Sequence, residues 1–208
     1  MKNLFLCSRF VQAAELFGPF ARAHMPGKEL LFIPTASYGE ADPRYVKAAL
    51  RAFVGMGYGV RVLEAAHTGP PAARAALERA AAVFVGGGNT FYLLWQLQRA
   101  GLLEPLRGRV LQGMAYIGES AGAMLAAPDI DYCRFLDDPQ KAPGLRGSKA
   151  LGLTGFYTLP HYGDPCYAAA CRQTLRRYGG LPLAPIGNGQ ALWVQGGQVR
   201  LLGGGRDT

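Results

Sequence analysis

The stretch YIGESAGA, residues 116–123, contains the pattern G-x-S-x-G with Ser120 at its centre. The apolar residues 114–117 before it indicate a buried strand, and the alanine-rich residues 121–127 after it suit a helix. A strand that turns sharply into a helix lifts one side chain above the sheet, and flanking glycines leave room for that turn. The pattern therefore predicts Ser120 as a catalytic nucleophile, although a serine before a helix can also be a simple N-cap.

Apolar runs alternate with helical patterns through the first 125 residues or so. We expect strands at 3–8, 29–35, 60–63, 82–85 and 114–117, and helices at 11–25, 43–56, 70–80 and 91–100. Asp42 and Pro43 are typical of the N-cap and first position of the second helix. This alternation predicts an α/β fold with a mostly parallel sheet and helices on both faces, whose ligand sites lie beyond the carboxyl ends of the strands.

The rest of the chain is less regular and predicts no second domain, so we expect one α/β domain over residues 1–208. Residues 128–150 are interpreted as a surface loop that could serve as a lid, and residues 165–178 as a helix. Residues 191–194 and 198–202 alternate around a Gly-Gly pair, which predicts a closing β-hairpin.

Composition and charge disfavour several classes of protein, among them nucleic-acid-binding, metal-binding and membrane proteins. The chain has 208 residues and a net charge of +8, but its basic residues are spread out. The densest group, residues 172–177, suits a solvated helix face better than a nucleic-acid site. The four cysteines form no C-x-x-C pair, so neither a metal site nor a disulfide framework is expected. No apolar run could span a bilayer and no leader is evident, so we expect a cytoplasmic protein without membrane or nucleic-acid partners.

A serine nucleophile needs a base. Of the three histidines, His161 directly follows an apolar strand and a proline, so we expect it to be the base, whereas His24 and His67 are expected at the surface. The residue that orients the imidazole is left open between four candidates, which are Asp137, Asp138, Asp164 and Asn188.

The developing oxyanion needs preorganised donors. The N–H of Ala121 is one candidate, and Gly88 or Asn89, in the glycine turn after the fourth strand, could provide another. The same turn could instead hold a phosphate, but it lacks the lysine of a P-loop. Glu119, next to the nucleophile, is interpreted either as a polar wall of the site or as a structural hydrogen-bonding partner.

Taken together, these motifs resemble the peptidase E, or aspartyl dipeptidase, family. The resemblance rests on GGGNTF at 86–91, GLL at 101–103, YIGxSAGA at 116–123 and the Pro-His pair ending at His161. It implies a class I glutamine-amidotransferase-like fold and hydrolysis of dipeptides with an N-terminal aspartate. It further implies Ser120 as nucleophile, His161 as base, Gly88 and Ala121 near the oxyanion, and no metal or cofactor.

The chain departs from the family pattern at several positions. Glu119 stands where a tryptophan is common, and Asn188 stands where the family has an acidic acceptor. Asn188 could still orient the imidazole through its amide oxygen. Asp138 corresponds loosely to an acidic family residue, and Arg172 aligns weakly with an arginine expected to bind the substrate aspartate.

These departures keep two alternatives open. One is a short-form hydrolase with the same nucleophile but another small substrate, and the other is a non-catalytic small-molecule binding protein on the same fold. An amidotransferase is disfavoured because that chemistry uses a cysteine at the position of Ser120. The expected partner is a small peptide substrate, and the chain could be a monomer or a homodimer.

Overall fold

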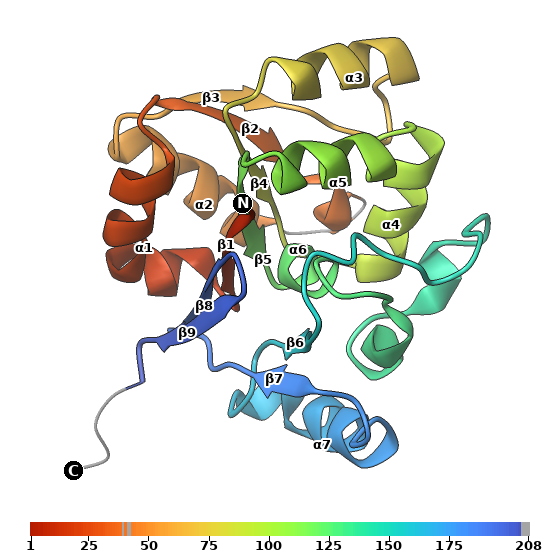
Figure 1. Cartoon of the computed structure of the whole chain (residues 1–208). Helices are drawn as coiled ribbons and strands as arrows, with labels where there is room; N and C mark the ends of the chain where they lie inside the picture. Colours follow the sequence, from red (N-terminus) through yellow and green to blue (C-terminus); the bar gives the residue numbers. More distant parts are fainter. Residues whose placement is uncertain (39, 41–42, 205–208) are drawn as a thin grey trace.

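The fold is built around a seven-stranded sheet with the strand order β3-β2-β4-β5-β1-β8-β9 (Figure 1). The computed structural model describes residues 1–38, 40 and 43–204. The strands are β1 (Asn3–Cys7), β2 (Glu29–Ile33), β3 (Gly59–Val62), β4 (Ala82–Val85), β5 (Ala115–Glu119), β8 (Ala191–Gln195) and β9 (Gln198–Leu202). The five strands from β3 to β1 in this order pair in parallel, while β8 and β9 are antiparallel. The predicted α/β fold and its C-terminal hairpin are therefore confirmed.

Helices cover both faces of the sheet because its central strands are apolar on both sides. On one face lie α1 (Phe10–His24) and α2 (Arg44–Gly55), and on the other lie α3 (Pro70–Glu78), α4 (Thr90–Arg99), α5 (Leu103–Leu111) and α6 (Ala121–Met124). Each face of the sheet has its own hydrophobic core. In β1, Phe5 and Cys7 belong to the core under α1 and α2, and Leu4 and Leu6 belong to the core on the other face. This alternation is the pleat of a strand buried on both faces.

The C-terminal third packs a smaller unit beside the main sheet. Strands β6 (Tyr157–Leu159) and β7 (Leu183–Pro185) pair in parallel. Between them the chain forms the 3₁₀ turn η4 (Pro165–Tyr167) and the helix α7 (Ala168–Arg177). The turn from β6 into η4 and the turn between β7 and β8 both lie next to the end of β1, and each carries a side chain that hydrogen-bonds to Ser8.

Some elements differ from the expectations. Helix α5 and strand β7 were not expected, because proline and glycine interrupt α5 and β7 has only three residues. Residues 128–150 are not simply a surface loop, since Ile130, Tyr132 and Cys133 are fully buried there. The Tyr132 hydroxyl donates to the Thr158 carbonyl at 2.7 Å and so fixes this segment to β6. The predicted N-cap Asp42 lies outside the described residues.

The described part of the chain holds no helix that is both long enough and apolar enough to cross a membrane.

The aromatic cluster under α1 and α2 gives a test of this packing. Phe53 is fully buried and stacks on Phe10 at a ring distance of 4.3 Å, with Phe84 at 5.1 Å. We predict that Phe53→Ala lowers the free energy of unfolding by about 3–5 kcal/mol, as deletion of a buried ring usually does. Urea unfolding measures this. Its neighbour Val54 is 57% exposed, so Val54→Ala should cost under about 1 kcal/mol, and equal losses in both variants would contradict the packing.

Candidate active site

Ser120 lies at a strained turn between β5 and α6. Its backbone has φ 47° and ψ −104°, a region that residues other than glycine rarely occupy. A Cβ at Gly118 would lie 2.6 Å from the Gly122 carbonyl oxygen, and a Cβ at Gly122 would lie 2.0 Å from the Val85 carbonyl oxygen. The two glycines of the motif are therefore required by the close approach of β4, β5 and α6, and the turn presents the Ser120 hydroxyl at the edge of the sheet.

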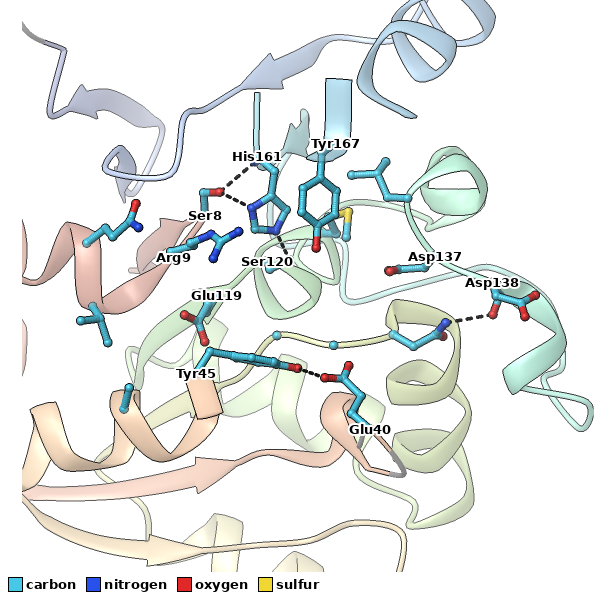
Figure 2. Close-up of a pocket in the computed structure, with 18 of the residues that line it drawn as sticks. Ser8, Arg9, Glu40, Tyr45, Glu119, Ser120, Asp137, Asp138, His161 and Tyr167 are labelled. Carbon is cyan, nitrogen blue, oxygen red and sulfur yellow. Dashed lines mark hydrogen bonds between the residues drawn. The ribbon is translucent and has the colours of Figure 1, made fainter. Parts of the chain in front are cut away.

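His161 reaches Ser120 from the smaller C-terminal unit. It follows β6, has a positive φ of 62°, and places Nε2 2.9 Å from Ser120 Oγ (Figure 2). Its backbone N–H donates to Ser8 Oγ at 2.8 Å, and the Tyr167 ring stacks on its imidazole with centroids 4.2 Å apart. Burial lowers the pKa of His161, so the imidazole is neutral and able to accept a proton near pH 7.

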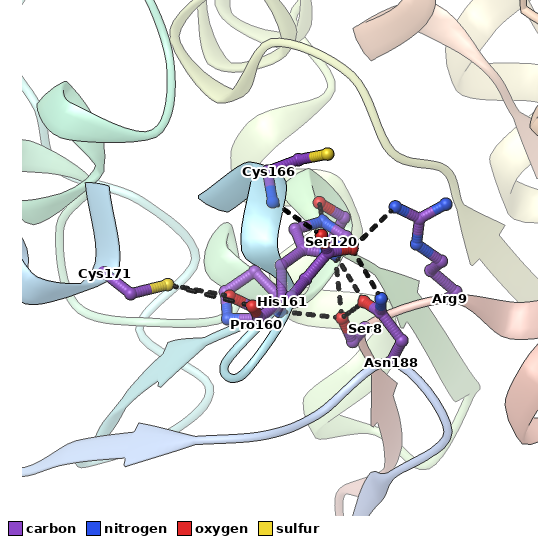
Figure 3. A network of polar contacts seen from close by, with 9 residues as sticks. Ser8, Arg9, Ser120, Pro160, His161, Cys166, Cys171 and Asn188 are labelled. Atoms are coloured by element: carbon purple, nitrogen blue, oxygen red, sulfur yellow. Dashed lines mark hydrogen bonds and ion pairs between the residues drawn. The ribbon is translucent and has the colours of Figure 1, made fainter. Parts of the chain in front are cut away.

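The other imidazole nitrogen, Nδ1, has two partners, of which Asn188 is the nearer and Ser8 Oγ, at 3.0 Å, is the second. Asn188 Oδ1 lies 2.8 Å from His161 Nδ1 (Figure 3), and Asn188 Nδ2 donates to Asp164 Oδ2 at 2.7 Å. Because a carboxylate only accepts, Asp164 fixes which end of the amide faces His161. Oδ1 must then accept from Nδ1–H, and the Nε2 lone pair is left facing the Ser120 hydroxyl.

The glycine turn after β4 lies next to Ser120. A Cβ at Gly87 would be 3.3 Å from the Ser120 Cβ, and at Gly88, where φ is 130°, it would overlap the Ala36 carbonyl. Ala121 is the first residue of α6, so its N–H has no partner within the helix. Two of the three predicted oxyanion donors, Gly88 and Ala121, thus flank the nucleophile.

The third predicted donor, Asn89, is already engaged. Its N–H donates to the Ala36 carbonyl at 2.8 Å, and its side chain caps α4 and donates to the Asp138 carbonyl at 2.9 Å. Asn89 therefore shapes the turn rather than offering a free donor to a substrate.

A cavity of about 540 Å³ opens in front of Ser120 and His161. Its walls carry six side chains of charged residue types. Five of them are labelled in Figure 2, namely Arg9, Glu40, Glu119, Asp137 and Asp138, and the sixth is Lys141. Carboxyl groups outnumber basic groups there, although the chain as a whole is strongly basic.

Two of the carboxyl groups in the cavity wall are buried. Burial raises the pKa of Glu119 to about 7 and that of Asp137 to about 6, against the lowering effect of nearby backbone N–H groups. Glu119 Oε1 accepts from the Phe10 N–H at 2.7 Å, at the start of α1, while Oε2 has no hydrogen-bond partner among the described residues. Asp137 Oδ2 accepts from the N–H and hydroxyl of Thr90. Glu119 is thus both a structural partner and part of the wall.

Arg172 lies outside the site. On α7 the buried positions are Cys171 and Thr174, so Arg172 is turned to solvent and does not line the cavity. The basic residue that does line it beside His161 is Arg9, which the sequence analysis did not single out. Ser8 and Arg9 directly follow strand β1. Ligand sites in parallel sheets lie at the carboxyl ends of the strands, so this position alone could have identified both residues as candidates.

The described residues contain no cluster of three or more His, Cys, Asp or Glu side chains that could hold a metal ion.

The raised pKa of Glu119 gives a second prediction. An unfolded chain loses this proton near pH 4.5, whereas the folded protein keeps it to about pH 7. The unfolding free energy should therefore fall as pH rises through this window, by roughly 2–3 kcal/mol from Glu119. Glu119→Gln keeps an acceptor for the Phe10 N–H but cannot titrate, so its unfolding free energy should not fall between about pH 4.5 and 7 on account of residue 119. Asp137 should still make the unfolding free energy of both proteins fall between about pH 4 and 6.

The measurement is urea unfolding of both proteins between pH 4.5 and 7.5. Glu78→Gln removes a carboxylate from the exposed Arg74–Glu78 pair on α3 and controls for net charge. A stability difference between wild type and Glu119→Gln that stays constant over the whole pH range would contradict the assignment.

Comparison with known proteins assigns the chain to a family. Residues 7–202 match the model of peptidase family S51. An uncharacterized peptidase of Pasteurella multocida is 40% identical over 195 residues, covering 93% of this chain and 94% of the relative. Peptidase E of Streptomyces coelicolor is 37% identical, covering 88% of this chain and 74% of the relative. A crystal structure of a candidate peptidase E from Listeria monocytogenes is 35% identical, with a TM-score of 0.91 over 97% of this chain and 98% of that one. The resemblance to peptidase E is confirmed, and this chain is a peptidase that belongs to family S51.

Proposed function

We propose that this peptidase is a serine hydrolase that removes the first residue of a short peptide, with Ser120 as nucleophile and His161 as base. The observation that carries the proposal is the 2.9 Å contact between Ser120 Oγ and His161 Nε2 at the mouth of the cavity. A hydroxyl at a sharp strand-to-helix turn, within hydrogen-bond reach of a neutral imidazole, is the arrangement that acyl transfer requires.

The proposed reaction has two halves. Ser120 Oγ attacks the scissile carbonyl carbon while its proton moves to His161 Nε2, and the carbonyl oxygen becomes an oxyanion near the N–H groups of Gly88 and Ala121. When the C–N bond breaks, His161 returns the proton to the leaving amine, and an acyl-enzyme remains on Ser120. A water molecule then attacks the ester carbonyl, gives its proton to His161, and the proton returns to Ser120 as the acid leaves.

Asn188 is the proposed orienting residue in place of an acid. Its amide oxygen accepts from Nδ1–H and so holds the imidazole in the productive tautomer. An amide carries no net charge, so at this distance the imidazolium formed during attack gains less stabilisation than it would beside a carboxylate.

The cavity suggests an N-terminal aspartate as the bound residue. Arg9 Nε and Glu119 Oε2 are buried without a hydrogen-bond partner among the described residues, and both side chains line the cavity. A guanidinium with one unpaired N–H and a carboxyl group with one unpaired oxygen, both in the cavity wall, fit a residue that carries an ammonium and a carboxylate. We propose that Glu119 binds the α-amino group and that Arg9, rather than Arg172, binds the aspartate side chain.

The charge balance of the cavity favours a second candidate substrate. Four carboxyl groups and two basic groups line the cavity, and Arg9 already pairs with Asp164. Such a site would favour dipeptides whose first residue is neutral or basic over those with an acidic one, and the preference should grow as pH rises and Glu119 and Asp137 ionise. A panel of Asp-X, Ala-X and Lys-X dipeptides separates the two candidates directly.

We predict that Ser120→Ala lowers kcat at least a thousandfold on the best dipeptide of this panel and on an activated ester, because the acyl-enzyme can no longer form. Steady-state kinetics with amine release as the readout measures this. Ser148→Ala removes a serine hydroxyl that does not line the cavity and serves as the matched control. Equal turnover by wild type and Ser120→Ala would exclude the proposed mechanism. Dipeptide binding without turnover by the wild type would support a binding protein instead.

We further predict that Arg9→Met lowers kcat/KM for Asp-X more than tenfold relative to its effect on Ala-X, because only Asp-X presents a side-chain carboxylate. The quantity to compare is the ratio of kcat/KM for Asp-X to kcat/KM for Ala-X. Arg9 also contacts Asp164, so the substitution lowers kcat/KM for every substrate to some extent. Arg172→Met is the control and should leave the ratio unchanged. An unchanged ratio in Arg9→Met would remove Arg9 from the specificity site.

A further inference from the structure

On the side of the His161 imidazole away from Ser120, a row of hydrogen bonds links the ring to the carboxylate of Asp164. His161 Nδ1 lies 2.8 Å from Asn188 Oδ1, and Asn188 Nδ2 donates to Asp164 Oδ2 at 2.7 Å. Arg9 donates to the same Asp164 oxygen at 3.1 Å. The Asp164 side chain is 11% exposed and the Arg9 side chain 43%, so the Asp164 end of the row is the more shielded from water and the Arg9 end is open to it.

The orientation of the Asn188 amide decides what His161 can do. An amide has a donor end and an acceptor end, and only the acceptor end suits a protonated Nδ1. Asp164 holds the donor end, and the Ser8 hydroxyl, which accepts from the His161 N–H, donates to the acceptor end at 3.0 Å. Asp164 selects this orientation because a carboxylate only accepts, whereas the Ser8 hydroxyl, which lies 3.0 Å from both Asn188 Oδ1 and His161 Nδ1, can donate or accept.

We infer that Asp164 is a positioning residue for the proposed hydrolysis: it fixes the Asn188 amide, and through it the tautomer of His161, and it supplies from one residue further away the negative charge that position 188 lacks. The inference rests on the proposed function of Ser120 and His161. It assigns the missing acid of the site to the N-cap of η4, in a different segment from the loop that holds Asn188.

The charged and titratable groups around His161 agree with this role. Arg9 lowers the pKa of His161 and Asp164 raises it, while Tyr167 stacks on the ring. The pKa of Asp164 is lowered, first by the hydrogen bond from Asn188, then by the Cys166 N–H and by Arg9. Asp164 is therefore ionised wherever His161 is neutral, so the amide orientation does not change across the pH range in which the base works.

Replacing Asp164 by asparagine breaks this arrangement without removing the side chain. Asp164 Oδ1 accepts from the Cys166 N–H at 2.9 Å and caps η4, and an asparagine oxygen can keep that bond. Its amide NH₂ would then meet the NH₂ of Asn188, and Asn188 would turn round. The NH₂ of Asn188 would donate to Nδ1, and the imidazole proton would move to Nε2, where it faces Ser120 and blocks proton acceptance.

A second substitution separates positioning from simple structural damage. Asn188→Asp puts a carboxylate directly on Nδ1–H, but it also places two carboxylates side by side, because Asp164 lies 2.7 Å from position 188. With Asp164→Asn added, the asparagine at 164 can donate to the new carboxylate, and an ordinary serine–histidine–acid arrangement results. The same Asp164→Asn change should thus harm the wild type and help the Asn188→Asp variant.

The test compares wild type, D164N, N188D and D164N/N188D on the best dipeptide. We expect D164N to lower kcat roughly 10- to 100-fold, the range typical for loss of an outer partner that orients a metal-bound histidine. KM for an Ala-X dipeptide should stay nearly unchanged, because Ala-X does not use Arg9, which Asp164 also contacts. The acid limb of kcat/KM should move to lower pH in D164N, because the charge that raises the pKa of His161 is gone. The double variant should exceed both single variants in kcat.

Imidazole ¹⁵N NMR of His161 provides a readout that does not depend on turnover. In the wild type, Nδ1 of the neutral imidazole should be protonated and Nε2 unprotonated. In D164N, the tautomer population should shift towards the form with the proton on Nε2. E78Q, which removes an exposed carboxylate on α3, controls for net charge and should change neither tautomer nor rate.

A folded D164N protein with wild-type kcat, pH profile and tautomer would overturn the inference, as would a double variant that is less active than both single variants. These results differ from failure of the proposed function, in which Ser120→Ala itself would be as active as wild type.

Discussion

The site depends on the tight turn at Ser120, where three parallel strands end together. The Ser120 N–H donates to the Cys7 carbonyl at 2.9 Å, which ties the turn to the end of β1, and Gly122 packs against the Val85 carbonyl at the end of β4. A residue at φ 47° costs free energy that these contacts must offset. Because β4, β5 and β1 are neighbours in the sheet, their ends bring the glycine turn, the nucleophile and the Ser8–Arg9 pair into one small space.

Electrostatics then distinguishes this site from a generic serine hydrolase. Its buried carboxyl groups, Glu119 and Asp137, have raised pKa values, so the cavity wall is less negative near pH 7 than a count of its acids would suggest. The fully ionised acid nearest the base is Asp164, which acts in our account through an amide. A charge placed one residue away from the imidazole orients it firmly, but it attracts a developing imidazolium less than a directly bonded carboxylate would.

The sequence was sufficient for the features that depend on local pattern. Strand and helix periodicity predicted the parallel sheet and the closing hairpin, and G-x-S-x-G with the strand end before His161 predicted the two side chains that meet. The roles of these residues remain predictions. Spacing could not choose between Asn188, Asp164, Asp137 and Asp138, because the choice depends on which turn of the C-terminal unit reaches Nδ1.

Other features were missed for related reasons. Arg9 was not singled out because nothing in its local sequence marks it, and its role comes only from the sheet order, which places β1 next to β5. Arg172 was proposed from a weak alignment, whereas the burial pattern of α7 turns it towards solvent. The segment 128–150 looked like a loop because its anchors are single buried side chains, which have no periodicity in sequence.

The central claim is that the Ser120 hydroxyl is activated by His161 at an accessible site, and covalent labelling tests it most directly. The account predicts that a fluorophosphonate adds once per chain, that peptide mapping by mass spectrometry places the adduct on Ser120, and that the labelling rate rises with pH as His161 loses its proton. No adduct, an adduct on another residue, or a rate that ignores the His161 titration would contradict it.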